Sequence, residues 1–309
     1  MINGVINVYK EVGYTSRDAV SRLTGILRQR KIGHTGTLDP AAEGVLPMCI
    51  GKATKLCELL TDHRKQYIAE IKFGIATDTE DVTGEVVEET SFSNEWYKEH
   101  LSESILSKVI SGFIGRQLQT PPMYSAKRVG GKRLYELARE GKVIERKPCE
   151  ITIYSIQIKN IDASNREATI VVDCSKGTYI RTLCKDIGKE LGCKAAMKSL
   201  IRTKTGDFLL ENSYKLDEIE KLVKENRVSE IIIPIEDVFK NLQRVDVSGY
   251  AGILLENGGI IKADAVKPDI EVLEPKNGEK FRMYNDKGEF KAVYSYNGDI
   301  NAFKIDKMF

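Results

Sequence analysis

The sequence predicts an α+β protein in which a mixed, largely antiparallel sheet is followed by a small β-rich domain. Its 309 residues suggest two domains, at a typical size of about 150 residues each. Candidate strands and helices interleave irregularly, without the repeating strand and helix units of a doubly wound fold. Near Val245 the pattern changes to short strands separated by turns. We therefore expect one domain over residues 1–240 and a second over residues 245–309.

Helices are expected where apolar residues recur at helical spacing. The first should begin at Ser16, after the capping hydroxyl of Thr15, and end at about Arg28. The segment 31–47 holds three glycines and two prolines, which predicts a long loop rather than regular structure. Further helices are expected at 94–111, 132–140, 179–191 and around 216–225.

Strands are expected where apolar and polar residues alternate. The clearest runs from Gln66 to Phe73, with Tyr67, Ala69 and Ile71 on one face together with Phe73. Other candidates lie at 150–158 and 168–174, and in the C-terminal domain at 281–284, 290–294 and 302–305.

The composition is that of an ordinary globular protein, with 41% hydrophobic and 30% charged residues. Six cysteines without a Cys-x-x-Cys pair and only three histidines predict no metal site. The N-terminus lacks the pattern of a secretory signal, and the longest aliphatic run, Ile231–Ile233, is far too short to cross a membrane. We expect a cytoplasmic protein with reduced thiols and no membrane association. Nothing in the sequence demands more than a monomer.

The net charge of +2 conceals an uneven distribution of charges along the chain. Residues 127–147 carry eight bases and three acids, and residues 176–204 carry eight bases and two acids. Residues 78–103 carry nine acids and one lysine, and residues 207–237 carry nine acids and four bases. This pattern predicts a basic face that could hold a polyanion. Lopsided but merely solvated helix faces would give the same counts.

Segment 31–55 places flexible-backbone residues around one carboxylate, Asp39. Gly33, Gly36 and Gly44 permit close approach of a ligand to the backbone, and Pro40 stiffens the residue next to the acid. The glycines lack the spacing of a phosphate-binding loop. Taken alone, an aspartate before proline is most often a turn or helix-cap residue. The residues therefore leave both a catalytic and a structural role open.

As a whole, KIGHTGTLDPAAEGVLPMCIGKATK resembles the catalytic motif of the tRNA pseudouridine synthase B family. The family pattern G-H-T-G-T-L-D-P, G-V-L-P and G-x-A-T-K is present from Gly33 to Lys55. Further matches follow in order along about 200 residues, namely GVINVYKEVGYTS, KQY, GIATDTEDVTGEV, QTPPMYSAKRVGGKRLYELAREG, CSKGTYIRTLCKDIG and SLIRTKTGDF. Two residues depart from the pattern: Glu11 replaces a proline, and Ile201 replaces an arginine that would contact the RNA backbone.

The resemblance implies a pseudouridine synthase catalytic domain followed by a PUA-like RNA-binding domain, and isomerisation of the T-loop uridine at tRNA position 55 without a cofactor. It implies that Asp39 is the essential carboxylate, that Arg181 pairs with it, and that Tyr67 stacks on the base. Whether Asp39 attacks C1′, adds to C6 or acts through a glycal is left open. Without the resemblance, Arg181 would be an ordinary surface ion-pair residue and Tyr67 an inward position of a strand.

The resemblance also implies substrate-binding residues. Leu200 would pack on the other side of the base, Tyr179 would support the catalytic ion pair, and His34 would occupy space left by extruded nucleotides. Lys127 and Arg202 would contact phosphates, which predicts strongly salt-dependent binding of the tRNA T arm. Three alternatives stay open: a guide-RNA-dependent synthase, an RNA-folding module with little catalysis, and, more remotely, a metal-free hydrolase that uses the same aspartate.

Overall fold

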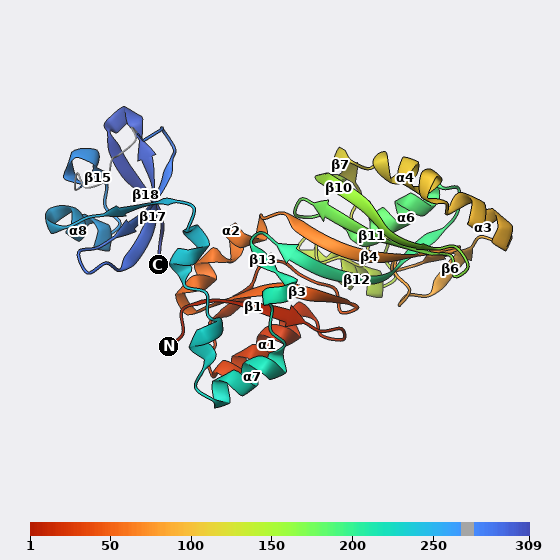
Figure 1. Cartoon of the computed structure of the whole chain (residues 1–309), viewed down its shortest axis with the longest axis horizontal. Coiled ribbons are helices and arrows are strands. Elements are labelled where there is room, and N and C mark those ends of the chain that lie inside the picture. Colours follow the sequence, from red (N-terminus) through yellow and green to blue (C-terminus); the bar gives the residue numbers. More distant parts are fainter. Residues whose placement is uncertain (267–274) are drawn as a thin grey trace. The chain divides into compact units, whose positions relative to one another are not determined.

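The computed structural model describes residues 1–266 and 275–309, which form two compact units (Figure 1). One unit comprises Met1–Ile6, Cys49–Lys55 and the described residues of Glu230–Phe309. The other comprises Asn7–Met48 and Leu56–Ser229. The predicted boundary between residues 240 and 245 stays a prediction.

The α-helices of the described chain follow the apolar periodicity of the sequence closely. The first has Thr15 as its N-cap, with the reciprocal capping box that Asp18 completes. In order, the helices are α1 (Ser16–Leu27), α2 (Cys57–Thr61), α3 (Asn94–His100), α4 (Glu103–Ser111), α5 (Leu134–Arg139), α6 (Ile180–Glu190), α7 (Leu216–Lys224) and α8 (Gly249–Glu256).

The strands include every segment that the alternation predicted. They are β1 (Gly4–Lys10), β2 (Ile32–His34), β3 (Ala42–Ile50), β4 (Lys65–Phe73), β5 (Ile75–Thr77), β6 (Val86–Glu89), β7 (Gly115–Gln119), β8 (Arg128–Val129), β9 (Lys132–Arg133), β10 (Cys149–Asp162), β11 (Glu167–Cys174), β12 (Ala195–Thr205), β13 (Phe208–Leu209), β14 (Gln243–Asp246), β15 (Ile261–Lys262), β16 (Lys280–Tyr284), β17 (Phe290–Asn297) and β18 (Ala302–Met308).

A mixed sheet forms the centre of the larger part of the fold. Its main path is β1-β3-β12-β4-β11-β10-β7, with β13 paired to β12 and β2 to β3. β4 pairs antiparallel with both β12 and β11, and β12 pairs parallel with β3. The alternation of β4 is confirmed, because Tyr67, Ala69, Ile71 and Phe73 are all buried. The predicted α+β class with a mixed, largely antiparallel sheet is thereby confirmed.

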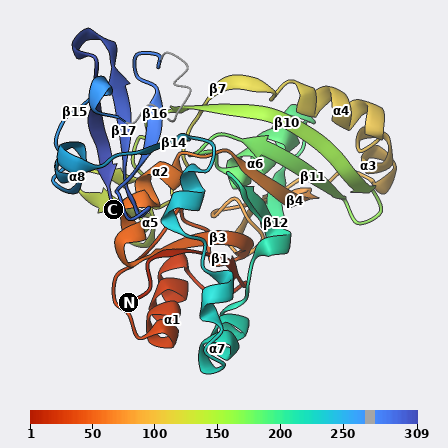
Figure 2. The same cartoon turned by 60° about the vertical axis from the view of Figure 1, so that its left-hand side comes forward.

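Helices cover this sheet at two places (Figure 2). α6 packs on β12 and β4, while α4 packs on β10 and α6. α1 packs beside α7, which lies more than 180 residues later in the chain. The helix that carries Arg181 therefore lies directly on the two strands that carry Tyr67 and Leu200.

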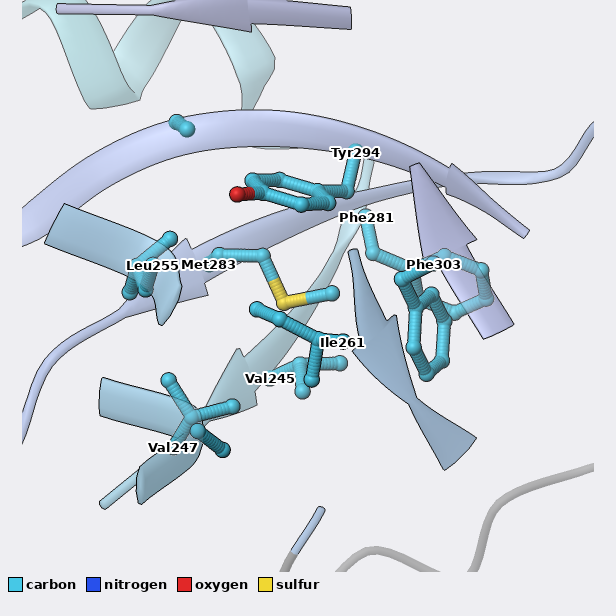
Figure 3. Close-up of a cluster of buried hydrophobic side chains, with 10 residues drawn as sticks. Val245, Val247, Leu255, Ile261, Phe281, Met283, Tyr294 and Phe303 are labelled. Atoms are coloured by element: carbon cyan, nitrogen blue, oxygen red, sulfur yellow. The ribbon is translucent and has the colours of Figure 1, made fainter. Parts of the chain in front are cut away.

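The C-terminal part is β-rich, as predicted, with a second sheet in the order β14-β16-β17-β18-β15. Its core is drawn in Figure 3, where Phe281, Met283, Tyr294 and Phe303 converge from β16, β17 and β18. The rings of Phe281 and Phe303 meet edge to face, with centroids 5.3 Å apart. α8 adds Leu255 to the same cluster.

The prediction that residues 31–47 form one long loop is wrong. Residues 32–34 form β2, and β3 begins at Ala42 and continues to Ile50. β3 is almost entirely buried between β1 and β12, so tertiary pairing overrides the turn preference of Gly44 and Pro47. Only the segment between these strands, which contains Asp39, is a loop.

Other elements also differ from the predictions, and α2, α8, β1 and β7 were not predicted. The helix expected over residues 94–111 is two helices, α3 and α4, because Leu101 ends the first and the β-region backbone of Ser102 caps the second. β12 was not predicted as a strand, although it lies in the middle of the sheet and carries Leu200 and Arg202.

No helix among residues 1–266 and 275–309 has the length and apolar character needed to span a membrane.

Candidate active site

The loop that carries Asp39 is fixed on both sides of the aspartate by Gly13, before α1, and by Ser16, the first residue of α1. The Ser16 hydroxyl accepts a hydrogen bond from the Leu38 amide at 2.9 Å and donates one to the Leu38 carbonyl at 3.2 Å. The Gly13 amide donates to the Pro40 carbonyl at 2.9 Å. The residues before and after Asp39 are therefore both anchored, and its side chain has a defined position.

Asp39 and Arg181 form an ion pair, as the resemblance implied, with Nε and Oδ2 3.0 Å apart. The Arg181 side chain is only 6% exposed, whereas that of Asp39 is 38% exposed. Burial raises the pKa of the Asp39 carboxyl, and the Arg181 guanidinium opposes that rise. A partly accessible carboxylate held by a buried guanidinium can present one oxygen to a bound ligand.

Arg181 is held by three further acceptors. Its Nη1 donates to the Thr79 carbonyl at 2.9 Å, and its Nη2 donates to the Tyr124 carbonyl at 2.7 Å. Asp81 lies 3.7 Å from Nη1 and is itself buried. Arg181 therefore bridges two carboxylates, and the second one also raises the pKa of Asp39.

Tyr67 and Leu200 lie on the same face of adjacent strands, since their Cα partners are Arg202 and Ala69 respectively. Each side chain is 7% exposed. Burial raises the pKa of the Tyr67 phenol, and the nearby Arg202 and Asp39 exert opposite effects on it. Tyr67 and Leu200 thus share one face of the sheet, and Asp39, in the loop before β3, is close enough to Tyr67 for its charge to raise the pKa of the phenol.

The prediction that Arg202 contacts phosphates is wrong for this structure, because the side chain is completely buried. Its Nε donates to the Val45 carbonyl at 2.7 Å, and its Nη2 donates to the Gly36 carbonyl at 3.2 Å. It also hydrogen-bonds the Tyr67 side chain. Arg202 consequently joins β3 to the loop of Asp39 and contacts Tyr67.

His34 and Lys10 complete the surroundings of the loop. Burial, and then the charge of Arg202, lower the pKa of His34, which favours the neutral imidazole. Its Nδ1 is buried without a hydrogen-bond partner among the described residues. Burial lowers the pKa of Lys10 to about 8, although the charge of Asp39 opposes this. The Lys10 ammonium donates to the Tyr14 carbonyl at 2.6 Å.

Tyr179, the N-cap of α6, and Lys127 are two further residues of the predicted site. Burial raises the pKa of the Tyr179 phenol, while Ser125 and Lys127 lower it. The backbone of Tyr179 makes two hydrogen bonds with the Gln119 side chain, at 2.8 and 3.0 Å. Lys127 is half-buried, and its Nζ lies 2.6 Å from the Cys149 sulfur. Tyr179 therefore lies within electrostatic range of both Asp39 and Lys127.

The two basic segments differ once they are folded. In residues 176–204 two arginines are buried, and four lysines pair with acids: Lys176 with Asp62, Lys185 with Glu80, Lys194 with Glu88, and Lys198 with Glu70 and Glu167. In residues 127–147, by contrast, Arg128, Arg139 and Lys147 are exposed and form no ion pair within the described chain. In residues 176–204, Lys189 and Lys204 are likewise exposed without an ion pair within the described chain, so the free cations of the predicted basic face come from both segments.

Sequence reasoning missed three residues of this site. Asp81 lies in the GIATDTEDVTGEV match but received no role, and Ser16 was read only as a helix start. Lys10 ends the apolar run GVINVYK, and a lysine in a buried strand is the signal that could have identified it. No group of three or more potential metal ligands occurs in the parts of the chain that are described.

The arrangement unites an accessible carboxylate, a buried guanidinium, an aromatic ring and an aliphatic wall. Such a set can hold a planar base between Tyr67 and Leu200 while Asp39 acts as a nucleophile or base toward it.

Comparison with known proteins agrees with this geometry. Residues 24–180 match the family described as TruB family pseudouridylate synthase (N terminal domain), and residues 181–240 match the tRNA pseudouridylate synthase B C-terminal domain. The chain is 46% identical to tRNA pseudouridine synthase B of Lachnoclostridium phytofermentans, over 100% of both chains. It is 40% identical to the protein of that name from Bacillus subtilis, over 95% of this chain and 93% of the other.

Among solved structures, a chain of a Cbf5-Nop10-Gar1 complex is similar, with a TM-score of 0.70 and 25% identity. The match covers 99% of this chain and 84% of that one. The catalytic loop, the sheet around it and the full-length relatives together show that this chain belongs to the TruB family of pseudouridylate synthases.

Proposed function

We propose that this protein is a cytoplasmic tRNA pseudouridine synthase that isomerises the T-loop uridine at position 55. The observation that carries the proposal is the 3.0 Å ion pair between Asp39 and Arg181, with Tyr67 close by. The reaction breaks the bond between C1′ and N1 and forms one between C1′ and C5. The C5 proton is lost and N1 gains a proton, so no cofactor is required.

In this proposal Asp39 starts the cleavage of the glycosidic bond, either as a nucleophile or as a base. Arg181 favours its ionised form and directs one oxygen. Tyr67 stacks on the uracil while it turns, and Leu200 packs on its other side. Tyr179 supports the ion pair, and His34 fills space left in the T loop.

The target uridine must leave the base stack to reach Asp39, at a cost of a few kcal/mol. Contacts with phosphates offset this cost, and the exposed lysines and arginines of residues 127–147, together with Lys189 and Lys204, are the candidates for these contacts. Lys127 belongs to this group, and its charge acts on the phenol of Tyr179. We propose residues 1–240 as the catalytic domain and residues 245–309 as a PUA-like RNA-binding domain, in a protein that acts as a monomer.

The test is conversion of a T-arm stem-loop labelled with tritium at uridine C5, using the purified protein alone. Wild-type protein should release one tritium per stem-loop without an added guide RNA. Asp39→Asn should abolish release while its affinity for the stem-loop stays within about threefold, since the change is isosteric and removes only the charge. Asp62→Asn is the matched control, because that carboxylate is 56% exposed and, among the described residues, forms an ion pair only with the exposed Lys176.

Full tritium release by Asp39→Asn would contradict the proposed catalytic role. Release by the wild-type protein only after a guide RNA is added would contradict the proposed substrate recognition. Release that maps to a T-arm uridine other than position 55 would contradict the proposed site.

A further inference from the structure

Glu80 has a backbone conformation that is unusual for a residue with a side chain. Its φ is +63°, in the left-handed region that favours glycine. The conformation belongs to the turn of residues 77–84, where the Glu80 carbonyl accepts from the Met197 amide at 3.0 Å and the Val82 amide donates to the Met197 carbonyl at 2.9 Å. A left-handed non-glycine residue persists only where the surrounding contacts hold it.

The two neighbours of Glu80 are the residues of this turn that hold Arg181. Thr79 offers its carbonyl to the guanidinium at 2.9 Å, and Asp81 offers its carboxylate at 3.7 Å. The position of residues 79–81 within this turn therefore determines two of the four contacts of the Arg181 guanidinium.

The Glu80 side chain contacts α6, the helix that carries Arg181. One carboxylate oxygen accepts a hydrogen bond from the Thr182 hydroxyl at 2.6 Å, and the other pairs with Lys185. The side chain is only 11% exposed, and Thr182 is buried. Thr182 directly follows Arg181, so Glu80 joins the first turn of α6 to the turn that receives its arginine.

We propose that Glu80 is a positioning residue for the catalytic arginine, and that its carboxylate fixes the first turn of α6 against the 79–81 turn so that the Arg181 guanidinium points at Asp39. The proposal rests on the catalytic roles assigned above to Asp39 and Arg181. Glu80 does not contact the substrate. Its loss should alter the reaction of bound RNA and leave RNA affinity unchanged.

Glu80→Gly is the decisive variant, because glycine accepts the left-handed backbone while the contacts to Thr182 and Lys185 are lost. We expect the single-turnover rate at saturating stem-loop to fall about tenfold or more, as small displacements of catalytic groups do. The RNA dissociation constant should stay within twofold, and the melting temperature within a few degrees. Glu80→Gln keeps an acceptor for Thr182 and should retain a rate within about threefold.

The pH profile gives a readout that general destabilisation would not move. Asp39 is influenced by burial, Arg181, Asp81 and Lys10, and Arg181 lowers its pKa. If the guanidinium is displaced in Glu80→Gly, the acid limb of the single-turnover rate should shift to higher pH. A rate within twofold of wild type with an unshifted acid limb would overturn the proposal.

Arg166→Gly is the matched backbone control, because Arg166 is also left-handed, with φ of +55°, and contacts Asn94 and Tyr97 instead of the site. It should keep the full rate. If Glu80→Gly does not fold, Thr182→Val and Thr182→Ser decide the matter, since only serine keeps the hydroxyl. Equal rates for these two variants would overturn the proposal. Asp39→Asn is measured alongside: if it is active, the catalytic assignment fails, whereas an inactive Asp39→Asn with a fully active Glu80→Gly refutes the role of Glu80 alone.

Discussion

Replacement of Arg202 tests whether this arginine contacts RNA phosphates or instead holds the buried surroundings of Asp39 in place. In Arg202→Met two backbone carbonyls, those of Val45 and Gly36, lose a charged donor. At about 1.5–3 kcal/mol for each such bond, the free energy of unfolding should fall by about 3–6 kcal/mol. At about 2 °C per kcal/mol for a chain of this size, the melting temperature should fall by about 6–12 °C.

The same variant should leave the salt dependence of RNA binding unchanged. Each lost phosphate contact lowers the slope of log K against log salt concentration by about one, but a fully buried guanidinium makes no such contact. Fluorescence anisotropy with a labelled T-arm stem-loop, from low to high potassium chloride, measures the slope. Differential scanning fluorimetry on the same samples measures the melting temperature.

Arg128→Met is the matched control, because Arg128 is exposed in the basic segment 127–147. It should lower the salt slope by about one and leave the melting temperature within about 1 °C. If Arg202→Met lowers the salt slope of RNA binding and leaves the melting temperature unchanged, the positioning role is refuted and the original prediction of a phosphate contact is supported.

Two further predictions concern the strands around the loop. Lys10 and Lys65 are buried with pKa values lowered to about 8, so each binds more protons in the unfolded chain than in the folded chain between pH 8 and pH 9, and each contributes a rise in stability over that range. The buried thiols of Cys174, Cys184 and Cys193, whose pKa values are raised, contribute a fall over the same range. Lys10→Met should remove the share of one lysine, so its urea midpoint should rise less from pH 8 to pH 9 than that of the wild type, and an identical change in both proteins would contradict the assignment. Gly44 has φ of +106°, and a Cβ there would lie 2.3 Å from the Arg202 carbonyl oxygen, so Gly44→Ala should lose about 2–6 kcal/mol in urea unfolding. Gly25→Ala, in the last turn of α1 with open space around it, should instead gain about 0.5–1 kcal/mol, and equal effects of the two changes would refute the steric argument.

The elements that the sequence predicted well are those whose signal is local. The capping hydroxyl of Thr15 and the apolar spacing after it define α1, and the alternation from Gln66 to Phe73 defines β4. The C-terminal strands β16, β17 and β18 are separated by turn residues and were found for the same reason.

The elements that were missed depend on distant partners. β3 contains a glycine and a proline that predict a loop, and it becomes a strand because β1 and β12 enclose it. β12 is rich in charged residues, yet its Arg202 is buried by bonds to residues about 160 positions earlier. No local pattern contains these contacts.

Sequence alone determined the family resemblance and identified Asp39, Arg181 and Tyr67 as candidates, because motifs that follow one another in a fixed order can be recognised without knowledge of the fold. Tertiary structure decided which charged side chains are exposed and free to contact RNA. The eight lysines and arginines of residues 176–204 predicted a binding face. Folding buries two of them, pairs four with acids and leaves Lys189 and Lys204 exposed. The roles of Arg202, Asp81 and Glu80 were likewise decided only by folding. A charge acts through its distance to other charges and through its burial, and both are fixed only when segments far apart in the chain meet.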